Sequence, residues 1–271
     1  MSDRPPAPES YRRLFRPPGL EGVEILHGGM SRGASAGGFF THFTISAVEG
    51  AVSCHHGGRC HQHAGRRVFL FNEGDFVPTK AHSTVSFRAC CVSPEALRAA
   101  ADEWGRSSPS PRFTRLVSTD RAFYGRVART VVSLTEAHEP LAQEEALTEL
   151  LHTVLVEQVA TVRASDDVML HGSVSRMRDL LHDGFNRTLS LDVLAERARL
   201  NKFHALRLFK RAIGIPPHEY QRRLRVAHAT KMLRAGHRIA DVACAVGFCD
   251  QSHLSRALRQ VTFITPGQYK P

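Results

Sequence analysis

Hydrophobic and polar residues follow two different periods along this chain, and the change between them divides it. From residue 23 to about 91, apolar and polar residues alternate in short runs such as FFTHFTISAV and RRVFLFNEGDFVPT, with turn residues at close intervals. This pattern is typical of short antiparallel strands and predicts a small β-barrel or sandwich. Beyond residue 173 the strand signals vanish, and helical segments alternate with short breaks to the end.

Helical periodicity begins directly after the predicted strands. The run SPEALRAAADEW reads as a helix, and two longer helices follow it, of which LAQEEALTELLHTVLVEQVATV is the clearer. Its apolar stripe lies largely opposite several glutamates and consists of Leu147, Leu150, Leu151, Val154, Leu155 and Val159. The stripe is wide enough to pack on the barrel or on a second copy of itself. Both packings stay open at this point, and the second would make a homodimer.

These patterns together predict an α+β protein. We expect an N-terminal antiparallel β-barrel with flanking helices, followed by an all-α C-terminal domain of two helix-turn-helix units joined by a long helix. The expected boundaries are a flexible Pro- and Arg-rich arm at 1–20, the barrel domain at 21–163, a linker at 164–173 and the helical domain at 174–271.

The helical domain contains an internal repeat. With a constant offset of 49 residues, LDVLAERARLNKFHALRLFKRAIGIPPHEY (191–220) overlies ADVACAVGFCDQSHLSRALRQVTFITPGQY (240–269) without a gap. Each copy reads as a short helix, a break and a second helix, with Ser190, Asn201 and Asp250 placed to cap helix N-termini. This is a helix-turn-helix, whose second helix can lie in the major groove of DNA.

Helical spacing separates the two faces of each second helix. The predicted buried positions are Ala205, Leu208, Phe209, Leu254, Leu258 and Val261. The predicted base-reading positions, which face outward, are Lys202, Phe203, Leu206, Arg207, Gln251, Ser252, Ser255, Arg256 and Arg259. Arginine can make a bidentate contact with guanine and Gln can read adenine, whereas Phe203 and Leu206 can only pack on thymine methyls or sugars. Alternatively, Arg207 and Arg256 hold phosphates or pair with nearby acids.

The segment between the copies, residues 217–236, reads as one continuous helix with Pro at its start and Gly at its end. A stiff spacer of this length would fix the distance between the two reading helices. Since major-groove faces on one side of a duplex repeat about every 34 Å, we predict a target of two successive major-groove segments. The residues that we expect to contact phosphates are Arg222, Arg223, Arg225, Asn201 and Lys210.

Charge supports the same division of the chain. The net charge is +10, but residues 1–171 carry 18 Lys and Arg against 19 Asp and Glu, whereas residues 172–271 carry 18 against 7. A basic module attached to a neutral one is typical of polyanion binding. The chain has no apolar leader and no run long enough to span a membrane, and its six cysteines lack a disulfide framework. We therefore expect a cytoplasmic protein without membrane partners.

The helical domain resembles the AraC/XylS-type transcriptional regulators. The resemblance covers roughly 173–271 and rests on LAERARLNKFHALRLFKRAIGIPPHEYQRRLRVAHATKMLRAG, on IADVACAVGFCDQSHLSRALRQ and on TPGQY. It implies a double helix-turn-helix domain that binds double-stranded promoter DNA, joined to an N-terminal effector or dimerisation domain. The chain departs from the family pattern at Leu206, at Leu258 and at Phe263, where a Gly usually ends the last reading helix.

The N-terminal half resembles the cupin-type sensor domain of the same family, over about 24–92. This resemblance implies a barrel that binds a small-molecule effector, with RNA polymerase as a further candidate partner. The residues that we expect to line the effector pocket are Phe40, His42, His55, Phe69 and Phe71. We expect neither a cofactor nor enzymatic activity.

The run CHHGGRCHQH (54–63) is the one segment that suggests metal chemistry. If its two glycines form a hairpin turn, alternation puts Cys54, His56, His61 and His63 on one face. Such ligands suit zinc, copper or nickel, so a metal- or thiol-responsive regulator is the alternative function. The run lacks Cys-x-x-Cys pairs, and the histidines of a metal-using cupin are missing elsewhere. We therefore expect ordinary residues of the barrel wall and no bound metal.

Overall fold

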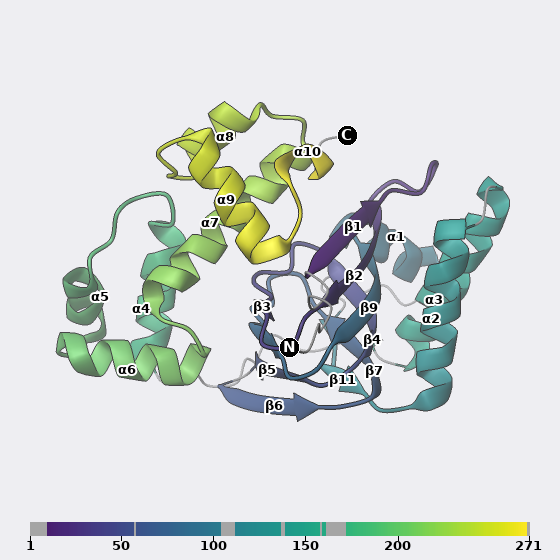
Figure 1. Cartoon of the computed structure of the whole chain (residues 1–271), viewed down its shortest axis with the longest axis horizontal. Coiled ribbons are helices and arrows are strands. Elements are labelled where there is room, and N and C mark those ends of the chain that lie inside the picture. The colour runs from purple at the N-terminus through teal and green to yellow at the C-terminus, as the bar shows by residue number, and fades with distance from the viewer. Residues whose placement is uncertain are drawn as a thin grey trace, which may run out of the picture.

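The structure is a computed structural model that describes residues 10–56, 58–103, 112–136, 139–157, 159–160 and 172–269. The strands lie together in the N-terminal half, helices cover one side of them, and the C-terminal helices pack against the opposite side (Figure 1). Residues 1–9 of the predicted arm and 164–171 of the predicted linker fall outside the described residues.

Two antiparallel sheets form the N-terminal domain. The larger sheet has the order β1 (Tyr11–Phe15), β2 (Val23–Met30), β9 (Val85–Val92), β4 (Phe43–Glu49), β7 (Arg66–Phe71) and β11 (Val117–Ser118). The smaller has the order β3 (Ser35–Ala36), β8 (Thr79–Ala81), β5 (Val52–His56) and β6 (Arg59–His63). A separate pair joins β10 (Arg112–Phe113) to β12 (Val159–Ala160). The expected antiparallel β domain is therefore confirmed.

Alternation along β7 shows how the sequence builds two layers of core. Val68 and Leu70 point to one face of the large sheet, where they join a core shared with helices. Phe69 and Phe71 point to the other face, where they join a core shared with the small sheet. Successive side chains of a strand point to opposite faces, so a strand that is apolar at every position lies between two packed layers.

Three helices cover the outer face of the large sheet, namely α1 (Pro94–Glu103), α2 (Arg121–Glu136) and α3 (Pro140–Glu157). The apolar stripe of α3 packs into the core of this domain through Leu150, Leu151, Val154 and Leu155. The stripe packs mainly on α2, which itself contacts the large sheet, and packing on a second copy stays a prediction. Leu141 at the start of α3 remains exposed.

The structure corrects the expected N-terminal arm. Residues 11–15 are not a flexible tail but form β1, which pairs along its whole length with β2. Leu14 and its partner Leu26 both pack against the core of the C-terminal helices. This segment is therefore ordered because Leu14 packs both against Leu26 on the neighbouring strand and against the core of the C-terminal helices. The linker also ends earlier than expected, because α4 (Gly172–Asp183) begins at Gly172.

The C-terminal domain continues with α5 (Leu191–Ala198), α6 (Lys202–Ile213), α7 (Pro217–Arg234), α8 (Ile239–Ala245), α9 (Gln251–Thr262) and α10 (Pro266–Tyr269). The three predicted caps are confirmed, because the side chains of Ser190, Asn201 and Asp250 accept hydrogen bonds from the first turns of α5, α6 and α9. We refer to α5 and α6 as the first unit and to α8 and α9 as the second unit. No helix among the described residues is long and apolar enough to cross a membrane.

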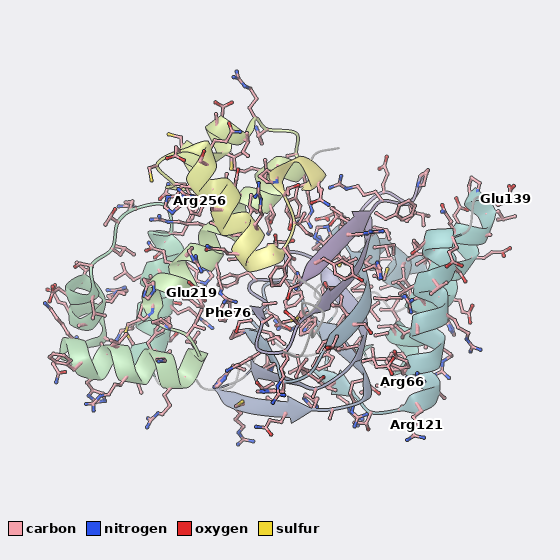
Figure 2. All side chains as sticks on the ribbon, in the orientation of Figure 1. Arg66, Phe76, Arg121, Glu139, Glu219 and Arg256 are labelled. Carbon is pink, nitrogen blue, oxygen red and sulfur yellow. The ribbon has the colours of Figure 1, made fainter. Side chains whose placement is uncertain are left out.

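An aromatic cluster joins the barrel to the first unit and α7. The rings of Phe39 and Phe76 lie 5.0 and 4.8 Å from the ring of Tyr220, measured between centroids. Tyr220 is fully buried and also contacts Phe209 of α6. Figure 2 places Phe76 beside Glu219, where the barrel meets α7. The N-terminal domain and the helical domain thus share a packed interface.

Candidate DNA-binding surface and interdomain cavity

The second helices of both units, α6 and α9, present the outward faces that the sequence predicted. The six positions expected to be buried are all buried. Of the nine expected base-reading residues, seven are exposed and two, Leu206 and Ser255, are half-buried. Phe203 is 78% exposed, which is unusual for a phenylalanine and leaves its ring without a protein environment. Arg256 points outward from α9 in Figure 2.

Two of these residues already have partners in the DNA-free protein. The Nζ atom of Lys202 lies 2.7 Å from Oδ1 of Asp192 on the preceding helix, and both side chains are exposed. The hydroxyl of Ser255 donates to the carbonyl of Gln251 over 2.8 Å. An exposed ion pair contributes little free energy, so DNA can compete for Lys202.

Arg225 links the segment after α4 to the second unit. Its guanidinium donates to the carbonyl oxygens of Phe185 (2.7 Å), Arg187 (2.9 Å) and Gly247 (2.7 Å). The first two acceptors lie in the segment after α4, and the third lies in the turn of the second unit. Burial lowers the pKa of Arg225, although this guanidinium remains charged at any ordinary pH. One side chain on α7 therefore fixes the second unit against the segment that leads from α4 into the first unit.

Arg222 and Arg223 are also used inside the protein. Arg222 donates to Gln260 of α9 over 2.6 Å and pairs with Glu219, while Arg223 donates to Glu219 over 2.8 Å. Arg223 reaches further, to the carbonyl oxygens of Ala36 and Gly37 on the barrel. Burial raises the pKa of Glu219, but the hydrogen bonds from both arginines lower it more, so that it falls below its usual range.

In the DNA-free protein Arg222, Arg223 and Arg225 all have protein partners, so their expected phosphate contacts stay a prediction. The sequence shows them as a basic cluster, whereas the structure engages each guanidinium with protein acceptors. The spacing of Glu219 three and four residues before two of them is a sequence signal for ion pairs along a helix. The backbone acceptors of Arg225 carry no such signal. Asn201 caps α6 by accepting from the His204 amide over 2.9 Å, and Lys210 remains exposed.

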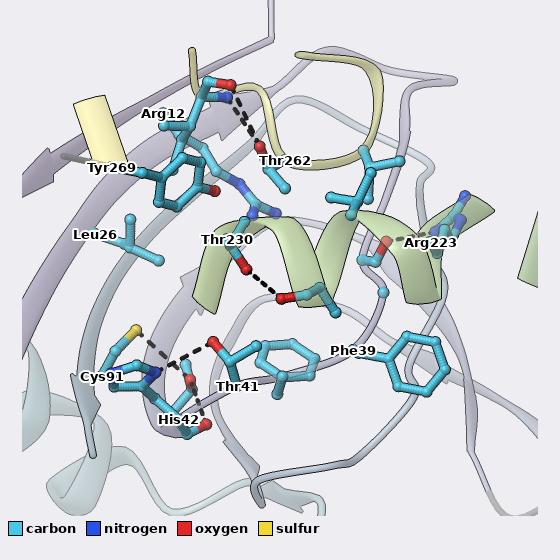
Figure 3. A pocket seen from close by; sticks show the side chains of 18 of the residues that line it. Arg12, Leu26, Phe39, Thr41, His42, Cys91, Arg223, Thr230, Thr262 and Tyr269 are labelled. Atoms are coloured by element: carbon cyan, nitrogen blue, oxygen red, sulfur yellow. Dashed lines mark hydrogen bonds between the residues drawn. The ribbon is translucent and has the colours of Figure 1, made fainter. Parts of the chain in front are cut away.

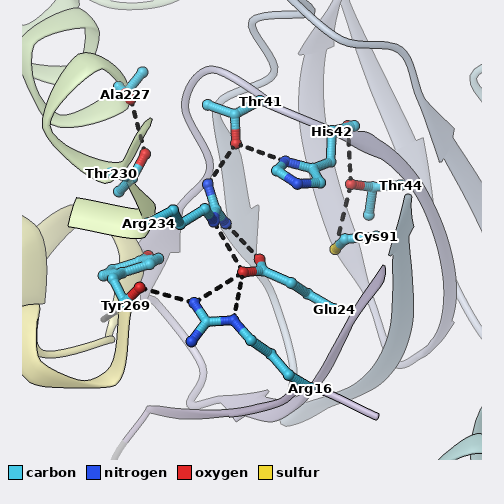
Figure 4. Close-up of polar contacts among 10 residues, drawn as sticks. All are labelled: Arg16, Glu24, Thr41, His42, Thr44, Cys91, Ala227, Thr230, Arg234 and Tyr269. Carbon is cyan, nitrogen blue, oxygen red and sulfur yellow. Dashed lines mark hydrogen bonds and ion pairs between the residues drawn. The ribbon is translucent and has the colours of Figure 1, made fainter. Parts of the chain in front are cut away.

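A buried ion-pair network fastens α7 to the large sheet (Figure 4). Glu24 of β2 has only 5% of its side chain exposed and accepts two hydrogen bonds from Arg234, at 2.6 and 2.9 Å. Arg16 approaches the same carboxylate at 3.1 Å and also donates to the carbonyl of Tyr269. Burial raises the pKa of Glu24, but Arg234 and then Arg16 reverse this, so the net pKa is lowered. Buried charges need such pairing to be tolerated.

Next to this network lies a cavity of about 100 Å³ between the barrel, α7 and the second unit (Figure 3). It is lined by Arg12, Leu26, Gly37, Gly38, Phe39, Phe40, Thr41, His42, Thr44, Cys91, Arg223, Val226, Ala227, Thr230, Arg234, Val261, Thr262, Ile264 and Tyr269. Burial and then Arg234 lower the pKa of His42 to about 4, and burial raises the pKa of Cys91 to about 11. Both are neutral at pH 7, so the arginines supply the charge of the lining.

The residues predicted for an effector pocket fall into three places. Phe40 and His42 line the cavity. The rings of Phe40, Phe69 and Phe71 stack on one another, with centroids 4.0 and 5.9 Å apart, and fill space between the two sheets. His55 lies elsewhere, against Gly214 at the end of α6. The structure thus brings four of the five near one another and separates His55.

The cysteine- and histidine-rich hairpin has the predicted register, with Cys54 opposite His61 and His55 opposite Cys60. Cys54 is 1% exposed in the core between the sheets, where burial raises the pKa of its thiol to about 11. The rings of His61 and His63 stack at 6.3 Å, and His63 meets Phe69 edge-on. Within the described part of the chain, no three Cys, His, Asp or Glu residues gather closely enough to hold a metal ion. A metal-responsive function is therefore not favoured.

Comparison with known proteins agrees with this geometry. A family described as a helix-turn-helix domain matches residues 194–271. An uncharacterized HTH-type transcriptional regulator of Bacillus subtilis, YbfI, is 26% identical over 196 residues, which cover 69% of this chain and 71% of that protein. The transcriptional activator AarP of Providencia stuartii is 28% identical over 98 residues, covering 36% of this chain and 73% of AarP.

Similarity to solved structures extends over both domains. A crystal structure of apo ToxT from Vibrio cholerae matches 92% of this chain and 97% of its own with a TM-score of 0.51 and 11% sequence identity. At that identity the match describes the fold alone, an N-terminal β domain followed by helix-turn-helix units. A putative AraC-like transcription regulator of Streptomyces lividans is 33% identical over 91 residues, covering 33% of this chain and 30% of that protein. The C-terminal part of the chain is therefore a helix-turn-helix domain of the AraC type, and the proteins that it matches are helix-turn-helix transcriptional regulators.

Proposed function

We propose that this protein regulates transcription by reading two successive major-groove segments of a promoter with one polypeptide. The observation that carries the proposal is the pair of capped helices, α6 and α9, whose outward faces expose Arg207 and Arg256 and whose units are joined by α7. The base-reading residues in this proposal are Lys202, Phe203, Leu206, Arg207, Gln251, Ser252, Ser255, Arg256 and Arg259. Such a fixed pair of helices favours one spacing of two DNA blocks.

Phosphate contacts in this proposal come from side chains that the protein leaves exposed. Lys210 is exposed on α6, and Asn201 lies at the N-terminus of that helix, where the helix dipole and free amides favour an anion. Arg222, Arg223 and Arg225 instead position the reading helices by holding α7, the second unit and the barrel together. Their contribution to DNA binding is therefore one of geometry.

The second part of the proposal is that the N-terminal domain senses a small molecule in the interdomain cavity. The lining comes from the barrel, from α7 and from α9 with the segment that follows it. A ligand there touches both domains at once, so its binding free energy depends on their relative position. Because such a ligand contacts α9 directly, it can move the second unit without a conformational change in the barrel core.

Selection of binding sites from random duplex DNA by the purified full-length chain tests the regulator function. We expect one asymmetric motif with two blocks about one helical turn apart. Arg256→Ala should weaken binding by about 1–3 kcal/mol and relax base choice within one block. Arg98→Ala is the matched control, because Arg98 is exposed on α1, away from both units. Absence of any enriched motif, or equal effects of both variants, would contradict the proposal.

A further inference from the structure

Arg12 on β1 is a half-buried cation with one unused donor. Within the described part of the chain, its Nε atom is buried and has no hydrogen-bond partner. The guanidinium carbon lies 5.2 Å from the ring centre of Phe87 and 5.7 Å from that of Phe263. These ring contacts hold the charge in place, but they do not satisfy the N–H group. A buried donor without an acceptor is costly, so its presence points to a missing partner.

The surroundings of Arg12 are deficient in negative charge. The cavity that it lines contains Arg223 and Arg234 but no acidic residue. The carboxylates nearest to these arginines, Glu219 and Glu24, are already used, since each accepts from two guanidinium groups. Burial lowers the pKa of Arg12, because removal from water disfavours the charged guanidinium. An anion in the cavity would supply a counter-charge.

The rest of the lining describes the body of the ligand. Around the cationic end stand the apolar side chains of Leu26, Phe40, Val226, Ala227, Val261 and Ile264. A cavity of about 100 Å³ is smaller than the roughly 300–1,000 Å³ of pockets for drug-sized ligands. Apolar walls next to a cation fit a molecule with one anionic group and a compact hydrocarbon body. An inorganic anion would make no favourable contact with those walls.

We propose that the cavity binds a compact organic monocarboxylate whose carboxylate accepts hydrogen bonds from the guanidinium of Arg12. This inference deepens the proposed sensor function and rests on it. The ligand would lie between β1, α7 and the segment that follows α9, so that its carboxylate neutralises Arg12 and its body touches both domains. Arg12 then serves ligand binding at the expense of the stability of the empty protein.

Thermal unfolding of the empty full-length protein gives the first test, because it needs no ligand. Arg12→Met removes the charge and the unpaired Nε donor but keeps an apolar stem of four atoms, so the melting temperature should stay the same or rise by a few degrees, roughly 2–4 °C per kcal/mol. Arg13→Met is the control, since Arg13 is the next residue of β1 and is exposed. A clear fall in the melting temperature with Arg12→Met alone would show that Arg12 serves the fold, and would overturn the proposal.

Ligand-induced stabilisation gives the second test. The probes are cyclohexanecarboxylate, phenylacetate and isovalerate, each compared with its own primary amide, and sulfate as an inorganic anion. We expect at least one carboxylate to raise the melting temperature of the wild type and of Arg13→Met saturably, while its amide does not. With Arg12→Met the apparent affinity should fall by about tenfold or more, and Arg12→Lys should retain part of it.

The remaining outcomes separate the possible failures. If no carboxylate gives a stabilisation that depends on Arg12, or if Arg13→Met loses it equally, the anion site is wrong. If sulfate stabilises as well as the carboxylates do, the organic ligand class is wrong. DNA site selection with Arg12→Met should still return the motif of the wild type. If the wild type itself selects no motif, the regulator function fails, whatever the carboxylates do.

Discussion

The two helix-turn-helix units share one sequence pattern, yet they meet the barrel in different ways. The first unit ends at Gly214, whose φ is +90°, and a Cβ there would lie only 2.7–2.9 Å from carbon atoms of His55. The second unit ends at Phe263, whose φ is +57° although it is not a glycine, and its ring lies 5.7 Å from Arg12. The contact at Gly214 is possible only because that residue has no side chain, whereas the contact at the end of the second unit is made by the side chain of Phe263.

This difference bears on how a signal could reach DNA. The first unit contacts the barrel at its hairpin and, through Tyr220 of α7, at the aromatic cluster, and none of the described lining residues of the cavity lies on α6. The second unit contributes Val261 and Thr262 to the cavity itself. In the proposed sensor function, a ligand in the cavity would therefore touch the second unit directly, whereas it would have no direct contact with α6. The repeated sequence thus forms two similar reading helices, of which α9 lines the cavity and α6 does not.

The largest effect should come from breaking the attachment of α7 to the barrel. Glu24→Gln removes the charge that Arg234 and Arg16 share, and breaking a buried pair costs about 3–5 kcal/mol of unfolding free energy. Since the pKa of Glu24 in the folded protein is lowered, its stabilisation is present at neutral pH and is lost as the pH falls through that pKa. Urea unfolding at a series of pH values measures both quantities.

The control for this variant is Glu49→Gln, because Glu49 forms an exposed pair with Arg66. We expect that pair to contribute no more than about 1 kcal/mol. Glu24→Gln should also flatten the loss of stability toward acid pH, which Glu49→Gln should leave unchanged. Equal effects of the two variants would mean that the buried network does not hold α7.

The second largest effect should come from separating the two units. Arg225→Met removes the guanidinium donor of the Phe185 and Gly247 carbonyls, while the Arg187 carbonyl keeps its hydrogen bond from Gln221; we expect a loss of about 1.5–3 kcal/mol of unfolding free energy. Affinity for a DNA site with both blocks should fall, while affinity for a single block changes little. Fluorescence anisotropy with both kinds of duplex measures this. An equal loss of affinity for both duplexes would instead indicate that Arg225 contacts a DNA phosphate.

The sequence predicted what depends on neighbours along the chain. The caps at Ser190, Asn201 and Asp250 and the buried faces of α6 and α9 follow from spacings of three or four residues, and they were predicted as the structure has them. The roles of Arg223 and Arg12 depend on partners far along the chain, such as the carbonyl of Gly37, 186 residues from Arg223. No local sequence pattern shows that a distant backbone carbonyl will accept a hydrogen bond from an arginine. From the sequence alone, the basic cluster of Arg222, Arg223 and Arg225 is therefore interpreted as a phosphate-binding surface.

A third prediction compares the two reading helices through equivalent arginines. Arg207→Ala and Arg256→Ala should each weaken the selected site by about 1–3 kcal/mol. Each should relax base choice in a different block, because the two residues lie on different units. Repeating site selection with both variants checks this. Relaxation of the same block by both would contradict the assignment of one block to each unit.

The smallest effect concerns the ends of the two reading helices. Phe263→Ala keeps the left-handed backbone of a residue with a Cβ but loses the ring, whereas Phe263→Gly also relieves the strain. The Gly variant should therefore be more stable than the Ala variant by about 1 kcal/mol. Gly214→Ala should be destabilising, since it adds both strain and a clash with His55. Thermal unfolding of the three variants tests whether the two ends differ as described.

The rigid coupling of the two units is the central claim, and a helical-phasing experiment tests it most directly. In the selected DNA site, the distance between the two blocks is changed by half a helical turn and then by a full turn, about 5 and 10 base pairs. Because α7 and Arg225 fix the reading helices, both insertions should reduce the affinity of the wild type to that of a single block. Affinity that stays the same at every spacing would show that the units move independently and would contradict the account.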